Sequence, residues 1–123
     1  MKLPSLLVAT TLAISPLASA WRVYFYNWEN ENPDGGYITE GGPGNPGSRC
    51  FSNVDPLNNK ISSLRYYSDN PEGTTRCCLH LYDSPGCDNE FKVGPICRDQ
   101  FVNLHNIGID NDISSYKTEC YRI

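Results

Sequence analysis

The chain has 123 residues, with 10 basic and 14 acidic side chains and a formal net charge of −4. Phosphate backbones and anionic membrane surfaces attract positive surfaces, so this balance disfavours binding to nucleic acid or to a membrane. Nine prolines and ten glycines interrupt any helical periodicity, and the short segments between them are rich in β-branched and aromatic residues. This composition predicts an all-β protein.

Residues 1–20 have the three-part pattern of a secretory signal peptide. Lys2 supplies the positive charge, an apolar run extends over residues 3–14, and residues 18–20 (Ala-Ser-Ala) have the form of a cleavage site. The run is short and interrupted for a membrane span; a buried strand or an uncleaved anchor is the alternative. We therefore expect a secreted mature domain of residues 21–123, outside the membrane, with a formal charge of −5 because Lys2 is lost.

All six cysteines lie in the predicted mature domain. An even number of cysteines in a short secreted chain indicates disulfides, here up to three, but the sequence does not choose among the possible pairings. No pair has the C-x₂-C spacing of a zinc site. The expected disulfide-forming residues are Cys50, Cys77, Cys78, Cys87, Cys97 and Cys120.

Strand candidates alternate with segments of turn-forming residues. Asn30–Gly36, Asp69–Gly73 and Ser84–Gly86 predict turns, and the glycine-rich Gly41–Gly47 predicts a flexible loop within one domain. The expected strands are Arg22–Asn27, Ile61–Tyr67, Cys77–Tyr82 and Ser115–Arg122, with weaker candidates at Glu90–Val93 and Phe101–Leu104.

The chain repeats two short patterns, which indicates two similar halves. Tyr24–Asn27 and His80–Asp83 are strand ends that run into turns containing proline and glycine. Asn58–Ser63 and Asp110–Ser115 both fit (N/D)(N/D)-x-x-(S/T)-S, with isoleucine in the same place. We call these two segments the template loops.

The residue types in the template loops suit calcium, which takes six to eight oxygen ligands. Paired Asn and Asp residues offer side-chain oxygens, the following residue offers a carbonyl, and the first serine offers a hydroxyl. Ile61 and Ile113 are expected to point inward and hold each loop to the core. The EF-hand pattern is absent, and the alternative is that these are ordinary turn residues.

Two such templates, each following an aromatic-ended strand and a turn, resemble the calcium-binding members of the βγ-crystallin family. The resemblance covers nearly all of residues 21–123. It implies two Greek-key halves in one sandwich, and two calcium ions held between the template loops, to which each loop contributes. It implies oxygen ligands from Asn58, Asn59, Lys60 and Ser62, from Asp110, Asn111, Asp112 and Ser114, and from Asn27 or Asp83 in the hairpins.

This sequence departs from the family pattern at three points. The first hairpin, from Tyr26 to Gly35, is longer than its counterpart from Tyr82 to Gly86. Six cysteines are not a general feature of the family. The first template has no carboxylate, so one of the two sites is expected to be the weaker. We expect the calcium ions to stabilise an extracellular structural or interaction module that has no catalytic activity.

Two other functions fit parts of the sequence. A small acidic ribonuclease could use His80, His105, Glu90 and Arg98 for proton transfer, although no local motif supports it. A secreted antimicrobial, killer-toxin-like or host-directed effector could use the same fold to bind an extracellular protein or glycan. Exposed Trp21, Trp28 and Tyr37 could bind such a partner, but we expect these aromatic residues to fill the core of so small a domain.

Overall fold

The computed structural model describes residues 19–44, 47–88, 92–109 and 111–123. These residues form antiparallel strands and two short 3₁₀ helices, η3 (Pro33–Gly35) and η5 (Leu104–Ile107). The strands are β2 (Trp21–Tyr26), β3 (Tyr37–Gly42), β4 (Gly47–Phe51), β5 (Ser63–Tyr67), β6 (Thr75–Tyr82), β7 (Lys92–Ile96), β8 (Gln100–Asn103) and β9 (Ser115–Arg122).

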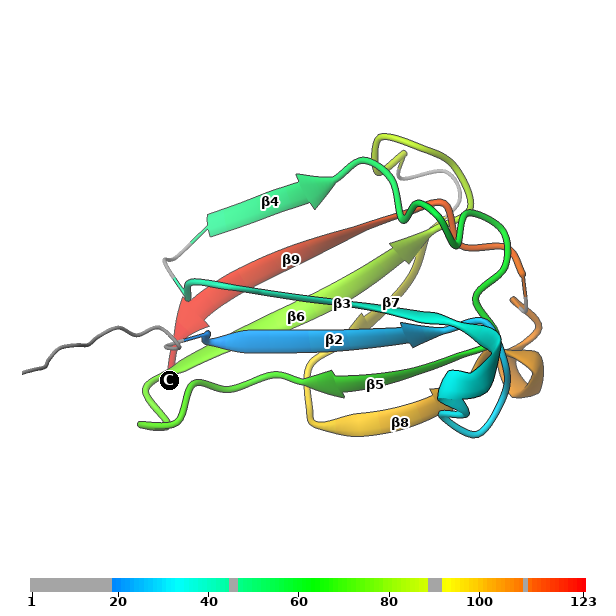
Figure 1. The fold of residues 1–123 in the computed structure, drawn as a ribbon. Coiled ribbons are helices and arrows are strands. Elements are labelled where there is room, and N and C mark those ends of the chain that lie inside the picture. Colours follow the sequence, from blue (N-terminus) through cyan, green and yellow to red (C-terminus); the bar gives the residue numbers. More distant parts are fainter. Residues whose placement is uncertain (1–18, 45–46, 89–91, 110) are drawn as a thin grey trace, which may run out of the picture.

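The strands form two four-stranded sheets, which Figure 1 shows as separate layers. Sheet I has the order β3-β2-β5-β8, and sheet II has the order β7-β6-β9-β4. Each half of the chain therefore gives its first, second and fourth strands to one sheet and its third strand to the other. The order in sheet I is therefore second, first and fourth strand of the first half, then the third strand of the second half. Sheet II has the same order with the two halves interchanged.

The core lies between the sheets, where the inward side chains of both meet. Alternation along β2 places Trp21, Val23 and Phe25 inward, and Tyr24 and Tyr26 outward. Tyr116 of β9 packs against this row, with its ring centroid 5.1 Å from that of Phe25. Burial of these apolar side chains is the main drive to fold. The two antiparallel sheets confirm the all-β prediction.

Most of the predicted strands are confirmed, with small shifts at their ends. Ser115–Arg122 has the predicted bounds, and the weaker candidate beginning at Glu90 is observed as Lys92–Ile96. The sequence prediction missed β3 and β4, and Gly41, Gly42 and Gly47 belong to strands although a flexible loop was expected. Both are edge strands without a buried position, so they lack the alternation that predicts a strand.

The structure selects one cysteine pairing out of the many possible. Cys77–Cys120 joins β6 to β9, Cys78–Cys97 joins β6 to the end of β7, and Cys50–Cys87 joins β4 to the turn after β6. The predicted three disulfides are thus confirmed. All of them lie in or beside sheet II, and they fit an oxidising environment.

The expectation that Trp21, Trp28 and Tyr37 fill the core is right for Trp21 and wrong for the other two. Trp21 is buried, whereas Trp28 is 49% exposed and Tyr37 is 51% exposed. Tyr37 points away from the core because it lies opposite the outward Tyr26. In the described ranges, no helix is long and apolar enough to cross a membrane.

Candidate metal centre

The two template loops lie together at the end of the molecule where β2 and β6 finish, on the right in Figure 1. The first loop is a tight turn in which the Lys60 amide donates to the Leu57 carbonyl at 2.9 Å. Asn59 and Asn111, the second residues of the two templates, have left-handed φ angles of 57° and 63°. Asparagine tolerates this conformation better than most residues, which explains its place in both loops.

Reciprocal backbone hydrogen bonds join the two loops. The Asn59 amide donates to the Ile113 carbonyl at 3.1 Å, and the Asn111 amide donates to the Ile61 carbonyl at 3.0 Å. Both isoleucine side chains are buried in the core, as the sequence predicts. The loops are therefore fixed to the core and to each other by equivalent contacts.

The same exchange brings side-chain oxygens together in two pairs. The Ser114 hydroxyl donates to Oδ1 of Asn59 at 3.1 Å, and the Ser62 hydroxyl donates to Oδ1 of Asn111 at 3.5 Å. Calcium lies about 2.3–2.6 Å from its ligands, so neighbouring ligands of one ion lie roughly 2.8–3.7 Å apart. Each pair combines oxygens from both loops at a spacing that fits one calcium ion.

The hairpin residues expected as further ligands lie beside these pairs. The Ser62 amide donates to the Tyr26 carbonyl at 2.8 Å, and the Ser114 amide donates to the Tyr82 carbonyl at 2.9 Å. Asn27 and Asp83 follow those two tyrosines in the chain, so each lies next to the serine of its own half. The two halves thus share an equivalent backbone contact between the hairpin and the first serine of the template.

Sequence reasoning missed the role of the last serine in each template. Ser63 donates from its hydroxyl to the Trp28 carbonyl at 2.7 Å and accepts from the Glu31 amide at 3.1 Å. Ser115 donates to the Ser84 carbonyl at 2.5 Å and accepts from the Cys87 amide at 3.0 Å. Each serine holds the turn of its own hairpin, and its recurrence in both templates was the available signal.

The side chains of the remaining predicted ligands have no described contact with the two oxygen pairs. Asn58 and Lys60 are exposed and Asp112 is partly buried, whereas Asp110 lies outside the described residues. Within the described part of the chain, no three or more His, Cys, Asp or Glu residues gather into a group that could hold a metal ion. The candidate centre instead offers amide, hydroxyl and carbonyl oxygens, which are ligands that calcium accepts.

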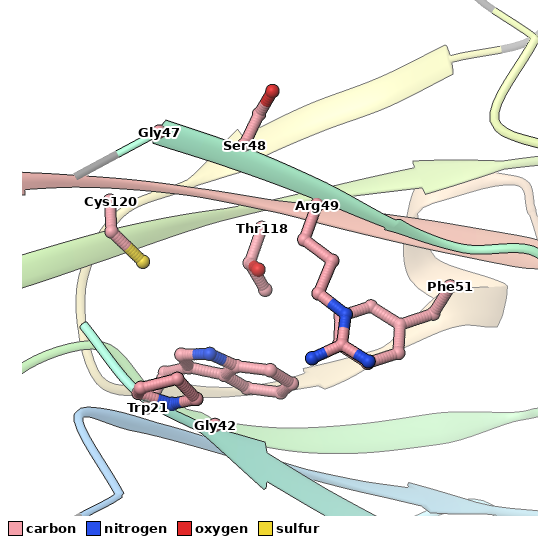
Figure 2. A pocket seen from close by; sticks show the side chains of 9 residues that line it. Trp21, Gly42, Gly47, Ser48, Arg49, Phe51, Thr118 and Cys120 are labelled. Atoms are coloured by element: carbon pink, nitrogen blue, oxygen red, sulfur yellow. The ribbon is translucent and has the colours of Figure 1, made fainter. Parts of the chain in front are cut away.

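A cavity of about 270 Å³ lies at the opposite end of the molecule. Figure 2 shows that the Trp21 ring, the Arg49 guanidinium and the Phe51 ring face it. The guanidinium carbon of Arg49 lies 4.8 Å from the centre of the Phe51 ring. A positive charge at this wall repels a metal ion, so the cavity is not a second candidate for calcium.

Three of the four residues considered for acid–base catalysis, His80, His105 and Arg98, lie in different parts of the described structure. His80 lies in sheet II with its Nε2 2.6 Å from Oε1 of Glu119, and burial lowers its pKa against the opposing effect of that carboxylate. His105 belongs to η5, next to sheet I, and Glu90 lies outside the described residues. Arg98 donates to the neighbouring Cys97 carbonyl. No described contact joins His80 to His105 or to Arg98.

Comparison of this chain with family models, with curated proteins and with solved structures found no match.

Proposed function

We propose that this protein is a secreted calcium-binding module in which two ions link the template loops. The observation that carries the proposal is the reciprocal pairing of Ser62 with Asn111 and of Ser114 with Asn59. The geometry of a single turn does not require equivalent pairs of oxygen atoms between two loops that are 52 residues apart in sequence.

We further infer that the halves are Greek keys of the βγ-crystallin type. The exchange of the third strand between halves supports this inference, because it gives both sheets the same strand order. The equivalent contacts of the two template loops support it independently.

Calcium would act here as a cross-link. Each ion would be held by the serine of one loop, by the second asparagine of the other and by a carbonyl near Asn27 or Asp83. Such binding stabilises the folded state by about 1.4 kcal/mol for each site at a calcium concentration ten times Kd. Extracellular modules bind calcium with Kd on the order of 10⁻⁴–10⁻³ M, which suits structural reinforcement.

The test is thermal unfolding of the oxidised protein and calorimetric titration with calcium. We expect calcium at millimolar concentration to raise the midpoint by several degrees over that in chelator, and magnesium to have little effect, because its octahedral preference is stricter. Ser62→Ala should remove one site and leave the one built on Ser114, so the stoichiometry should fall from two ions to one. An unchanged midpoint and no heat of binding would refute the proposal.

Two further variants sharpen this test. Ser68→Ala is a matched control, because Ser68 is a buried serine just beyond the other end of β5 that bonds to Asp69 and Asp99. It should lower stability without changing calcium affinity. Asn59→Asp replaces an amide oxygen with a carboxylate and should tighten binding; weaker binding would contradict the assignment of Asn59 as a ligand.

A second candidate function is an interaction module, either alone or together with calcium binding. The exposure of Trp28 and Tyr37 in the first hairpin favours it, because tryptophan and tyrosine are enriched at protein interfaces. Loss of target binding when these residues are replaced, with calcium affinity unchanged, would support it.

A further inference from the structure

Four tyrosine side chains lie on the outer side of sheet I, outside the core. Tyr24 and Tyr26 of β2, Tyr37 of β3 and Tyr67 of β5 form what we call the tyrosine face. Their neighbouring ring centroids lie 5.7–6.4 Å apart. Tyr37 and Tyr67 are 51% and 43% exposed, so the rings form one continuous surface open to solvent.

The fold does not require three of these four tyrosines, as the equivalent positions of sheet II indicate; Tyr26 alone has a tyrosine, Tyr82, as its equivalent. Where sheet I has Tyr24, Tyr37 and Tyr67, the repeat and the strand register place His80, Lys92 and Glu119 in sheet II. The same architecture is thus built with a histidine, a lysine and a glutamate at these positions. We therefore look for a role of the aromatic side chains on the outer side of sheet I other than stabilising the fold.

The first hairpin borders the tyrosine face on one side. Residues 28–31 fold over the outer side of sheet I. Ser63 donates to the Trp28 carbonyl, Asn103 accepts from the Asn30 amide, and Arg65 donates to the Glu31 carboxylate. The Trp28 indole covers Gly35 so closely that a Cβ there would come within 2.4 Å of the ring. One side of the indole is thereby supported while the residue stays 49% exposed.

The polar groups of this surface suit a ligand with many hydroxyls and a negative charge. Arg22 lies opposite Tyr67 and donates to the Thr39 and Ser19 hydroxyls. It forms no ion pair among the described residues, whereas Arg65 is paired with Glu31 at 2.6 Å. In an acidic chain, the tyrosine face therefore holds one guanidinium without a carboxylate partner.

We propose that the tyrosine face binds a pyranose glycan that carries carboxylates. The apolar C–H side of a sugar ring packs against an aromatic ring, its hydroxyls bond to the tyrosine and threonine hydroxyls, and a uronate pairs with Arg22. The outward positions on β2, β3 and β5 include no aliphatic side chain, which disfavours a protein partner with an apolar core. A single unpaired guanidinium is too little charge for a phosphate backbone.

The experiment is a calorimetric titration of the secreted, oxidised protein with two probes of equal length, an oligogalacturonate and a neutral cello-oligosaccharide. A chelator is present throughout, since uronates bind calcium themselves. We expect the oligogalacturonate to bind more tightly, and Arg22→Gln to remove that preference. Binding of neither probe, or no preference between them, would overturn the proposal.

Matched variants locate the surface. Tyr24→Ala combined with Tyr37→Ala should weaken binding by on the order of ten-fold per ring, as for other ligands stacked on aromatic side chains. Tyr121→Ala is the control, because Tyr121 is an equally accessible tyrosine, 43% exposed, on sheet II. If the double variant does not fold, Tyr67→Ser at the end of β5 gives the same test.

Equal weakening by Tyr121→Ala would overturn the proposal, as would displacement of the glycan by single-stranded poly(U). The glycan titration contains no calcium, so a failure to bind the glycan does not bear on the proposed calcium site. In the same way, a failure to bind calcium does not bear on the proposed glycan site.

Discussion

The two sheets share one strand order but are stabilised differently. Sheet II and its borders contain all three disulfides, and its outer side carries the His80–Glu119 pair. Sheet I contains no disulfide; hydrogen bonds between residues 28–31 and the side chains of Ser63, Arg65 and Asn103 hold the first hairpin on it. The shared core fixes the architecture, and the outer surfaces are free to differ.

The largest expected effect is the loss of a sheet II disulfide. Replacing both Cys77 and Cys120 with alanine should cost about 2–5 kcal/mol of unfolding free energy, because the bridge restricts the unfolded chain. Urea unfolding of the oxidised variant measures this cost. The control is Tyr67→Ala in sheet I, which removes an exposed side chain. If the control costs as much as the double variant, the contrast between the sheets is wrong.

The next effect concerns the serines that hold the hairpins. Ser63→Ala and Ser115→Ala should each cost about 1–3 kcal/mol, because each removes two hydrogen bonds to partly buried backbone groups. Ser115→Ala should cost less than Ser63→Ala, since the Cys50–Cys87 disulfide still fixes the second turn. Urea unfolding of both variants tests this order, and the reverse order would contradict the proposed division of roles.

A smaller effect tests whether the two halves are equivalent at the core. Ile61→Val and Ile113→Val each remove one buried methylene group and should cost about 0.5–1.5 kcal/mol. Because both residues occupy the same place in their loops, the two costs should agree within the error of chemical unfolding. A clear difference would show that the core supports one template loop better than the other.

The smallest effect lies at the link between the sheets. The hydrogen-bonded Arg76 guanidinium lowers the pKa of Asp69 from 3.8 to about 2. A carboxylate with a lowered folded pKa stabilises the protein above its unfolded pKa, and this stabilisation is lost as the pH falls from about 4 to about 2. Solvent screening keeps the effect small.

The measurement is the thermal midpoint of the native protein and of Asp69→Asn across that pH range. The variant should unfold at a slightly lower temperature near pH 7, and the difference should disappear near pH 2. A difference that grows on acidification would contradict the assignment.

The sequence predicted those strands whose residues alternate or are rich in aromatic and β-branched side chains. Ser115–Arg122 was found for this reason. The edge strand Gly47–Phe51 was not, because its pairing with β9 comes from a segment more than 60 residues away. Local residues cannot reveal a strand that exists only through a distant partner.

The candidate site was found through its repetition. The template loops, with Asn59, Asn111, Ser62 and Ser114, were identified from residue types that recur in both halves. Their reciprocal pairing was implied only by the family resemblance, because a hydrogen bond between loops depends on how the two sheets pack. The roles of Ser63 and Ser115 also needed the structure, since their partners lie in the hairpins.

The sequence by itself determined the all-β class, the two similar halves, the six disulfide-forming cysteines and the oxygen-rich loops, because these depend on residue type and local spacing. The tertiary structure decided which cysteines pair, which aromatic residues stay outside the core and which loop oxygens meet. Those outcomes depend on contacts between residues far apart in the chain, and such contacts exist only when the two sheets close on one core.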